Sequence, residues 1–317
     1  MILVNVQKIV EHGKTPAGMH IPIMVNEILD VLNIQPGEVG YDATLGYGGH
    51  TSRMLEKLNG QGHLYATDVD PIESEKTRNR LAAMGYGDSI LTIKRMNFAN
   101  IDEVAPGEKF DFVLADLGVS SMQIDNPERG FTFKQDGPLD LRLDPTSGIT
   151  ASQRLQELDE EELIALLVEN ADEPHAEQIS KAIMRLQASG CAITTTQQLR
   201  SVIENALAFL PPKDRKQEIK KSCQRTFQAL RIDVNSEYEV LYSFLEKLPT
   251  VLKSGGRVAV LTFHSGEDRL VKKAFKAGFK DGVYSAISDG VIRPTIEECY
   301  RNPRAHSTKL RWAIKGR

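Results

Sequence analysis

The sequence predicts an α/β fold, with a parallel sheet and crossover helices, that an all-helical insertion divides in two. Three observations predict it. Short apolar runs alternate with amphipathic segments from residue 39 to residue 116, a long and purely helical stretch follows, and the alternation resumes after residue 235. One α/β domain split by a helical insertion is the simplest arrangement that accounts for this order.

The first part of the sheet is expected between residues 39 and 116. Proline at the first turn of the second helix favours a helix start there. The nearly continuous apolar run of the fourth strand is typical of a strand that is buried on both faces. Right-handed crossovers would make these strands parallel. We expect strands at Val39–Ala43, His63–Thr67, Ile90–Lys94 and Phe110–Asp116, and helices at His50–Leu58 and Pro71–Met84.

The middle of the chain predicts a loop and then helices. Leu117–Pro145 is rich in Gly, Asp, Pro and Arg and has no period, and so long a loop in a compact protein is usually functional. Ala151–Leu210 has helical spacing throughout, with a capping box formed by Thr195 and Gln198, and Pro211-Pro212 is expected to end the run. Beyond it we expect a helix at Ser236–Leu252 with Asn235 as its N-cap, a turn at Gly255-Gly256, and strands at Arg257–Phe263 and Lys309–Ile314.

Composition limits the possible function. Of the 317 residues, 41% are hydrophobic and 26% are charged, which is typical of a folded soluble protein and excludes a disordered chain. No apolar stretch approaches the roughly 20 residues that span a bilayer, and Met1–Met19 lacks the features of a signal or transit peptide. We therefore expect a cytoplasmic protein with no membrane partner. Because Cys191, Cys223 and Cys299 are far apart in the sequence, no metal site is expected.

The charge distribution is uneven. A net charge of −4 argues mildly against binding to nucleic acid, because contacts with phosphates require cationic side chains. However, Lys213–Arg231 contains seven Lys and Arg against two acids, and Arg301–Arg317 contains six and no acid. Each cluster is compatible with a solvated surface or with an RNA contact.

A glycine-rich turn follows the first predicted strand and leads into a helix. Gly48, Gly49 and His50 stand where the chain bends, and the N-terminus of the next helix offers free N–H groups to an anion. Asp68, about 20 residues on, ends the second strand, where an acid can accept hydrogen bonds from ribose hydroxyls. Together these features indicate a nucleoside cofactor. The turn lacks dinucleotide spacing, so S-adenosylmethionine (SAM) is the first choice and NAD the second.

Two more side chains lie at the ends of predicted strands. Phe98 follows the third strand, where an aromatic ring can pack on adenine or simply close the core. Asp116 ends the fourth strand, at the edge where open α/β sheets bind ligands. A buried acid there requires a partner, such as a sulfonium cation or the amine of a base, unless it caps a helix.

The stretch that begins at Asp116 resembles the RsmH (MraW) family of SAM-dependent methyltransferases. It reads Asp116-Leu117-Gly118-Val119-Ser120-Ser121, and further matches extend from His20 to Arg311. They are His20-Ile21-Pro22, Gly48-Gly49-His50, Asp68-Val69-Asp70-Pro71, Gln123, Asp125, Arg129-Gly130-Phe131, Asp136-Gly137-Pro138-Leu139-Asp140, Arg142, Asp144, Arg225 to Ile232, Val234 to Glu237, Phe263-His264-Ser265, Glu267-Asp268-Arg269 and Asn302-Pro303-Arg304-Ala305.

The resemblance implies a Rossmann-like class I SAM-dependent methyltransferase sheet with an inserted all-helical domain. The sheet domain would comprise residues 20–146 and 225–317, and the helical domain, for recognition of RNA, residues 147–224. The implied reaction is methylation of N4 of a cytosine in the decoding region of 16S rRNA. The implied partner is the small ribosomal subunit, and a homodimer stays open. The implied SAM contacts are Gly48, Gly49, His50, Asp68, Phe98, Asp116 and Gln123, with Asp116 as the candidate catalytic residue.

Basic side chains in the predicted loop and beyond it are candidates for contacts with phosphates or bases. Their alternative role is to form ion pairs with neighbouring acids, above all for Arg142, which lies between Asp140 and Asp144. Two other functions stay open, namely methylation of another nucleic acid or protein and a non-catalytic role in ribosome assembly. The candidate RNA contacts are Arg129, Arg142, Arg225, Arg231, His264 and Arg304.

Overall fold

The computed structural model describes residues 21–317, and the expectations for Met1–Met19 and His20 lie outside the described residues. The described chain forms two units. The first consists of the residues up to Gly118 together with Val240–Arg317, and the second of Val119–Glu239. The helical unit therefore begins before residue 147 and ends after residue 224, so it is wider on both sides than the sequence predicted.

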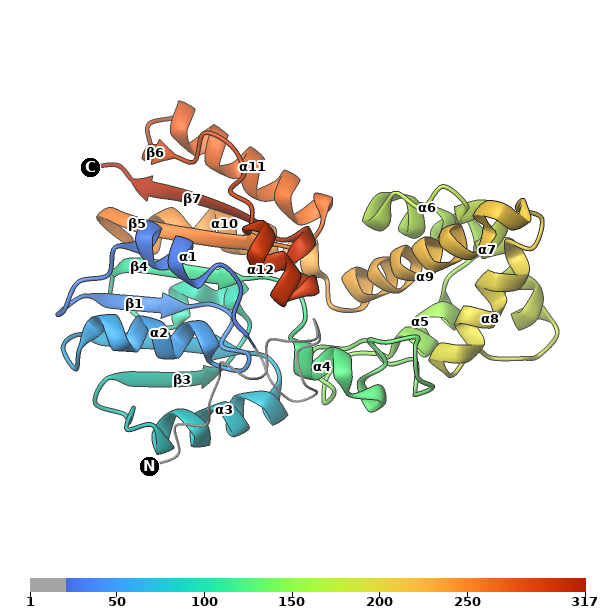
Figure 1. Ribbon diagram of the computed structural model, residues 1–317, viewed down its shortest axis with the longest axis horizontal. Helices are drawn as coiled ribbons and strands as arrows, with labels where there is room; N and C mark the ends of the chain where they lie inside the picture. The colour runs from blue at the N-terminus through green and yellow to red at the C-terminus, as the bar shows by residue number, and fades with distance from the viewer. Residues whose placement is uncertain (1–20) are drawn as a thin grey trace. The chain divides into compact units, whose positions relative to one another are not determined.

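Seven strands of the first unit form one sheet, in the order β3-β2-β1-β4-β5-β7-β6 (Figure 1). The first five are parallel, whereas β7 is antiparallel to both β5 and β6. The strand order reverses between β1 and β4, the point at which open α/β sheets bind ligands. The strands are β1 (Val39–Asp42), β2 (His63–Asp68), β3 (Leu91–Arg95), β4 (Phe110–Asp116), β5 (Leu252–Thr262), β6 (Tyr284–Ile287) and β7 (Lys309–Lys315).

Helices cover both faces of this sheet, as the nearly continuous burial of its central strands requires (Figure 1). One core holds apolar side chains of α1, α2 and α3 against the first face. The other holds those of η3, α10 and α11 against the second face. The helices of this unit are α1 (Val25–Leu32), α2 (Gly49–Leu58), α3 (Pro71–Ala83), η3 (Phe98–Glu103), α10 (Glu237–Val251, which starts in the second unit), α11 (Ser265–Lys280), α12 (Ile296–Arg301) and η5 (Pro303–Ser307).

The second unit is helical and has its own core. Leucine and isoleucine side chains of its five longer helices meet there, and Leu139 and Leu141 of the preceding loop are buried with them. Since the loop shares this core, it belongs with the helices, which explains the early boundary. The elements are α4 (Ser121–Asp125), η4 (Pro127–Arg129), α5 (Ala151–Glu157), α6 (Glu160–Ala171), α7 (Ala176–Ala188), α8 (Thr196–Ala206) and α9 (Pro212–Val234).

The α/β fold class with a helical insertion is confirmed, and the predicted strands of the first part are found within one or two residues of their expected bounds. The capping box of Thr195 and Gln198 is also present. The described helices are too short or too polar to span a membrane.

The run before Pro211-Pro212 ends as predicted, and Pro212 itself begins α9, because proline is well tolerated in a first helical turn. Two other local predictions were wrong. Asn235 ends α9, and its side chain bonds the backbone of Leu141 and Leu143, so it is not available as the N-cap of α10. The Gly255-Gly256 turn lies inside β5, where the register with β4 shifts.

Gly40 in the middle of β1 provides a test of the sheet. A Cβ atom at this position would lie 2.0 Å from the Phe112 ring of the neighbouring β4. Because Phe112 is fully buried, we expect Gly40→Ala to lower the free energy of unfolding by about 1–3 kcal/mol in urea titrations. Gly87→Ala is the matched control, since a Cβ atom there would have no other atom within 4 Å. Equal unfolding midpoints for the two variants would contradict this account.

Candidate functional site

A group of polar side chains lies at the carboxyl ends of β1 and β4, where the strand order reverses. Asp42 is fully buried at the end of β1, and its Oδ2 atom accepts a 2.6 Å hydrogen bond from the Thr51 hydroxyl of α2. The Thr44 hydroxyl accepts a 2.7 Å bond from the backbone N–H of Asp116. His50 Nδ1 lies 3.4 Å from Asp116 Oδ2. Two strand ends and one helix start therefore converge on one site.

His50 is buried between two acceptors. Its Nε2 atom lies 2.9 Å from the carbonyl oxygen of Ile23, and its Nδ1 atom faces the carboxylate of Asp116. A neutral ring has a single N–H group, so bonding both acceptors requires the imidazolium. Burial alone would lower the pKa of His50, but the hydrogen bond and charge of Asp116 outweigh it, so the pKa is raised. Asp116 thus favours the protonated form of His50.

One oxygen of Asp116 is uncommitted. Oδ2 faces His50, whereas Oδ1 is buried and has no hydrogen-bond partner among the described residues. A buried carboxylate oxygen without a donor is costly, so this atom is suited to a donor that a ligand brings. Burial also raises the pKa of the neighbouring Asp42, although the Thr51 and Thr44 bonds oppose the shift.

The glycine-rich turn and Asp68 lie beside this group. Asp68 ends β2, and its two oxygens accept backbone hydrogen bonds of 2.8 Å from Gly46 and 2.9 Å from Asp70. Gly48 is the N-cap of α2 and has a φ of 76°, and a Cβ atom there would lie 2.8 Å from the Thr77 side chain. The left-handed backbone and the close approach both require glycine. No side chain caps α2, so its first N–H groups are left for a ligand.

Comparison with known proteins decides the family. The profile of the MraW methylase family matches residues 17–316, nearly the whole chain. The chain belongs to the MraW methylase family. It is 64% identical over 312 residues to Ribosomal RNA small subunit methyltransferase H 1 of Agathobacter rectalis, covering 98% of this chain and 89% of the relative. It is 37% identical over 300 residues to Ribosomal RNA small subunit methyltransferase H of Acidobacterium capsulatum, covering 93% of this chain and 98% of the relative.

A solved structure of an rRNA methylase from Streptococcus thermophilus resembles this MraW methylase with a TM-score of 0.42 and 13% identity. The match covers 92% of this chain and 94% of that chain. A likeness at this level concerns the fold alone.

The methyl donor of this MraW methylase is SAM, the first choice from the sequence. The chemistry of the site fits it. Three carboxyl groups, those of Asp42, Asp68 and Asp116, outnumber the one imidazole of His50, which suits a cofactor that carries a sulfonium and an ammonium group. The same charges would repel the diphosphate of NAD, the second choice.

The binding of SAM to this MraW methylase should depend on pH through Asp68. Burial raises the pKa of this carboxyl to about 6. The ionised form is the better acceptor for ribose hydroxyls, and it is lost as pH falls through 6. If only that form binds, the apparent Kd at pH 5 should be about tenfold higher than at pH 7. Calorimetric titrations at both pH values would check this, and Asp68→Asn should lose this part of the dependence. A pH-independent wild-type Kd would contradict it.

The other two predicted SAM contacts have packing or capping roles of their own. Phe98 follows β3 and is partly buried, with its ring edge-on to Phe244 of α10 at a centroid distance of 5.3 Å. It therefore contributes to the core. Gln123 belongs to the second unit, where it is buried in α4 and forms a capping box with Ser120. The roles of Phe98 and Gln123 at the cofactor stay predictions.

Three predicted RNA contacts make internal bonds in the second unit. Arg142 forms a two-pronged ion pair with Asp140, at 2.7 and 2.8 Å, as its alternative role required. Arg231 forms an equivalent pair with Glu237, at 2.7 and 2.9 Å. Arg129 is buried and donates to two loop carbonyls. These guanidinium groups fix the loop and the end of α9, and their contact with RNA stays a prediction.

The remaining candidates differ in exposure. Arg225 is partly exposed, 3.9 Å from the buried carboxylate of Glu173. His264 belongs to the first unit, where it caps α11 and its Nε2 atom lies 3.1 Å from Glu267. Arg304, on η5, has an exposed side chain. Arg304 is thus the one candidate RNA contact of the six whose side chain is exposed, whereas the other five are buried or partly buried.

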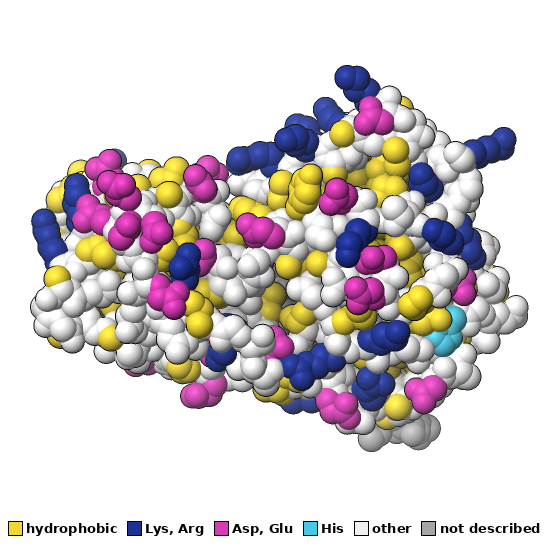
Figure 2. All heavy atoms as spheres, turned by 180° about the vertical axis from the view of Figure 1, so that it is seen from behind, with side chains coloured by type: hydrophobic (Ala, Val, Ile, Leu, Met, Phe, Trp, Pro, Cys, Tyr) yellow, Lys and Arg dark blue, Asp and Glu magenta, His cyan; other side chains and the backbone are white. Residues whose placement is uncertain are grey.

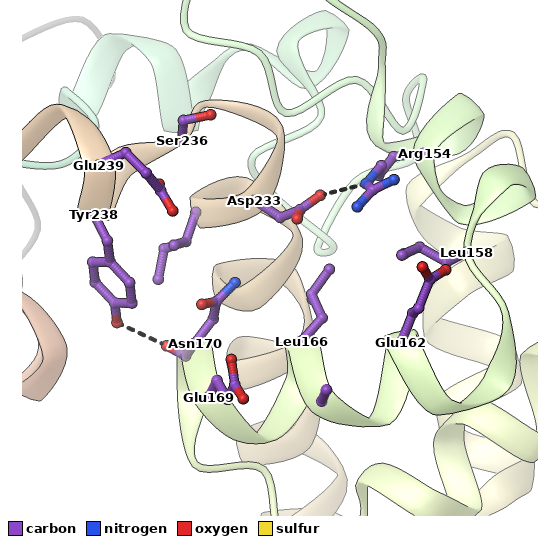
Figure 3. Close-up of a pocket in the computed structure, with 12 residues that line it drawn as sticks. Arg154, Leu158, Glu162, Leu166, Glu169, Asn170, Asp233, Ser236, Tyr238 and Glu239 are labelled. Atoms are coloured by element: carbon purple, nitrogen blue, oxygen red, sulfur yellow. Dashed lines mark hydrogen bonds and ion pairs between the residues drawn. The ribbon is translucent and has the colours of Figure 1, made fainter.

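The second unit also contains a pocket of about 380 Å³ (Figure 3). Arg154 is its one basic lining residue, and it is bonded at 2.8 Å to Asp233. Other acids line the pocket as well, namely Glu162, Glu169 and Glu239. A pocket with this excess of carboxylates disfavours phosphate, so the RNA backbone is not expected to enter it.

Sequence reasoning missed the buried partners of the site. Asp42, Thr44 and Thr51 support His50 and Asp116 but were interpreted only as parts of a turn and a helix. One signal was present, because Asp42 ends an apolar strand at the same edge of the sheet as Asp116. Two acids at the ends of neighbouring strands indicate a shared site.

Proposed function

We propose that this MraW methylase transfers a methyl group from SAM to N4 of a cytosine in the decoding region of 16S rRNA, position 1402 in the usual numbering. The observation that carries the proposal is the 64% identity, over 98% of this chain, to a relative named as a small-subunit rRNA methyltransferase. The buried acid group at the sheet edge supports the chemistry.

The cytosine amine is a weak nucleophile because its lone pair is delocalised into the ring. SAM, when bound, supplies a methyl group activated by a positive sulfur. Oδ1 of Asp116 is the candidate acceptor for an N–H of the amine, because it is buried and otherwise without a donor. Such a bond would orient the amine and concentrate its lone pair on nitrogen. As the carbon–nitrogen bond forms and the carbon–sulfur bond breaks, the amine loses one proton, and the carboxylate of Asp116 is the candidate acceptor for it.

The helical unit supports RNA as the substrate. Lys213, Lys216 and Lys220 lie at helical spacing along α9, are exposed and form no ion pair with the described residues. Phe209, just before this helix, has 63% of its surface exposed. Exposed cations next to an exposed aromatic ring suit phosphates and unstacked bases. A target base must leave its stack before it can reach the methyl group.

The test is methyl transfer from radiolabelled SAM to purified small ribosomal subunits, followed by nucleoside analysis of the rRNA. The expected product is N4-methylcytidine at one position. Label in another nucleoside or in a ribosomal protein would favour a different methyltransferase activity. Tight binding of SAM and of small subunits without any methyl transfer would instead favour a non-catalytic role in ribosome assembly.

A further inference from the structure

One face of α11 carries a row of lysines. Lys272, Lys273, Lys276 and Lys280 recur at helical spacing, and all four are exposed. The opposite face of the helix is buried on the sheet through Val271 and Phe275. In the region of α11, at the top of Figure 1, Figure 2 shows Lys and Arg side chains following one another along the edge of the molecule. We call these four residues the α11 lysine row.

The row has no acidic counterpart. Within residues 21–317, none of the four lysines forms an ion pair or a side-chain hydrogen bond. Several cations on other helices are matched by acids one turn away, which is the ordinary pattern of a solvated helix, although Lys57 of α2 and the three lysines of α9 named above are not. Those pairs are Arg53–Glu56, Lys76–Glu73, Arg78–Glu75, Lys181–Glu177, Arg200–Glu204 and Arg301–Glu297.

The acids of α11 itself are occupied elsewhere. Glu267 is buried and completes the cap with His264. Asp268 bonds Arg311 of β7 at 2.6 Å, and Lys309 lies 3.8 Å away. The exposed Asp281 follows the helix. Stabilisation of the C-terminal carbonyls by a cation can account for Lys280 alone, because that effect is confined to the last turn. Lys272, Lys273 and Lys276 lie before the last turn, so this stabilisation does not explain them.

The α11 lysine row lies on a helix that starts near the site, in the half of the helix that is farther from it. Leu261 of β5 is the register partner of Asp116, and α11 begins shortly after it, at Ser265. The helix therefore starts at the same edge of the sheet as the site and leads away from it. From Lys272 to Lys280 the row extends about 12 Å, given a rise of about 1.5 Å per residue, which is long enough to follow several phosphates. Phe279, beside the row, is 49% exposed.

We infer that the α11 lysine row is a docking surface for the phosphate backbone of the RNA that flanks the methylated base. The inference rests on the proposed function, and it adds a contact surface on the sheet unit to the one proposed on the helical unit. A polyanion is the partner that matches unpaired lysines in a line. RNA is the polyanion that a methylase of this family would meet, and the row could hold a part of it away from the methylated base.

The test is the salt dependence of binding to protein-free 16S rRNA, with Lys272, Lys276 and Lys280 all changed to Gln. Loss of three phosphate contacts should reduce the slope of log K against log salt by about 2, since each contact contributes roughly 0.7–0.9. Affinity should then fall on the order of 100-fold at about 0.1 M salt and converge with the wild type near 1 M. In methyl transfer, KM should rise while kcat and the Kd for SAM stay the same.

Two controls separate charge from structure. Replacement of the same three lysines by Arg should preserve affinity and slope. Lys57→Gln removes an exposed lysine that forms no ion pair with the described residues. Lys57 belongs to α2, which covers the other face of the sheet, so this variant should leave the slope unchanged. The single variant Lys276→Gln should reduce the slope by about 0.8.

The outcomes distinguish this inference from the proposed function. A wild-type protein that neither binds nor methylates rRNA would refute the proposed function. Normal methylation with an unchanged salt slope in the triple Gln variant would refute only the role of the row. A loss confined to binding of anionic phosphatidylserine vesicles, with rRNA binding intact, would assign the row to a membrane and would equally overturn the inference.

Discussion

Replacing Asp116 by Asn is expected to reduce kcat for methyl transfer about a thousandfold while the protein stays folded. The amide has nearly the same size as the carboxylate, so the backbone bond from Asp116 to Thr44 can persist. What is lost is the charge opposite His50 and the acceptor at Oδ1. Both would act on the attacking amine, so the effect should fall on kcat more than on binding.

The measurement is single-turnover transfer to small subunits with saturating SAM, accompanied by thermal unfolding. Asp102→Asn is the matched control, because Asp102 is an exposed carboxylate of the same unit that pairs with Lys247 at 2.8 Å. This variant should transfer methyl groups like the wild type. Near-normal activity of Asp116→Asn would remove Asp116 from the reaction.

Replacing Asp68 by Ala is expected to weaken SAM binding about 100-fold. The carboxylate holds the glycine turn through the N–H of Gly46 and is the candidate acceptor for the ribose. Each hydrogen bond to a charged group contributes about 1.5–3 kcal/mol, so loss of the ribose bond alone gives a change of this size. The effect should be on affinity, because the proposed contact of Asp68 is with the ribose of the cofactor and not with the reacting amine.

Titration calorimetry with SAM and with its demethylated product would measure this change. Asp88→Ala serves as the control, since Asp88 is an exposed acid of the same unit and should leave the Kd unchanged. Wild-type affinity in Asp68→Ala would show that the ribose is held by other groups.

Much of the sheet and part of the site could be predicted because they follow from local patterns. Apolar runs of strand length and glycine bends are visible in the sequence, and they bring Asp68 and Asp116 to one edge. The buried state of Asp42 was not predictable in the same way. An acid in a turn usually faces water, and only the position of α2 shows that Thr51 bonds it.

Partners of the arginines depend on tertiary structure. Arg142 and Asp140 are two residues apart, and their pairing could be weighed from the sequence. Arg231 meets Glu237 only because α9 ends between them and the chain turns back. The α11 lysine row was not noticed at all, because the absence of acids opposite it becomes visible only once the neighbouring strands are in place.

The position of β7 has a consequence for the integrity of the sheet. Its seven residues lie between β5 and β6, so β6 is joined to the other strands only through β7. Without β7, β5 would have an open edge, and an open edge invites pairing with other chains. A substitution that displaces β7 would therefore open the sheet at an internal strand and detach β6 as well.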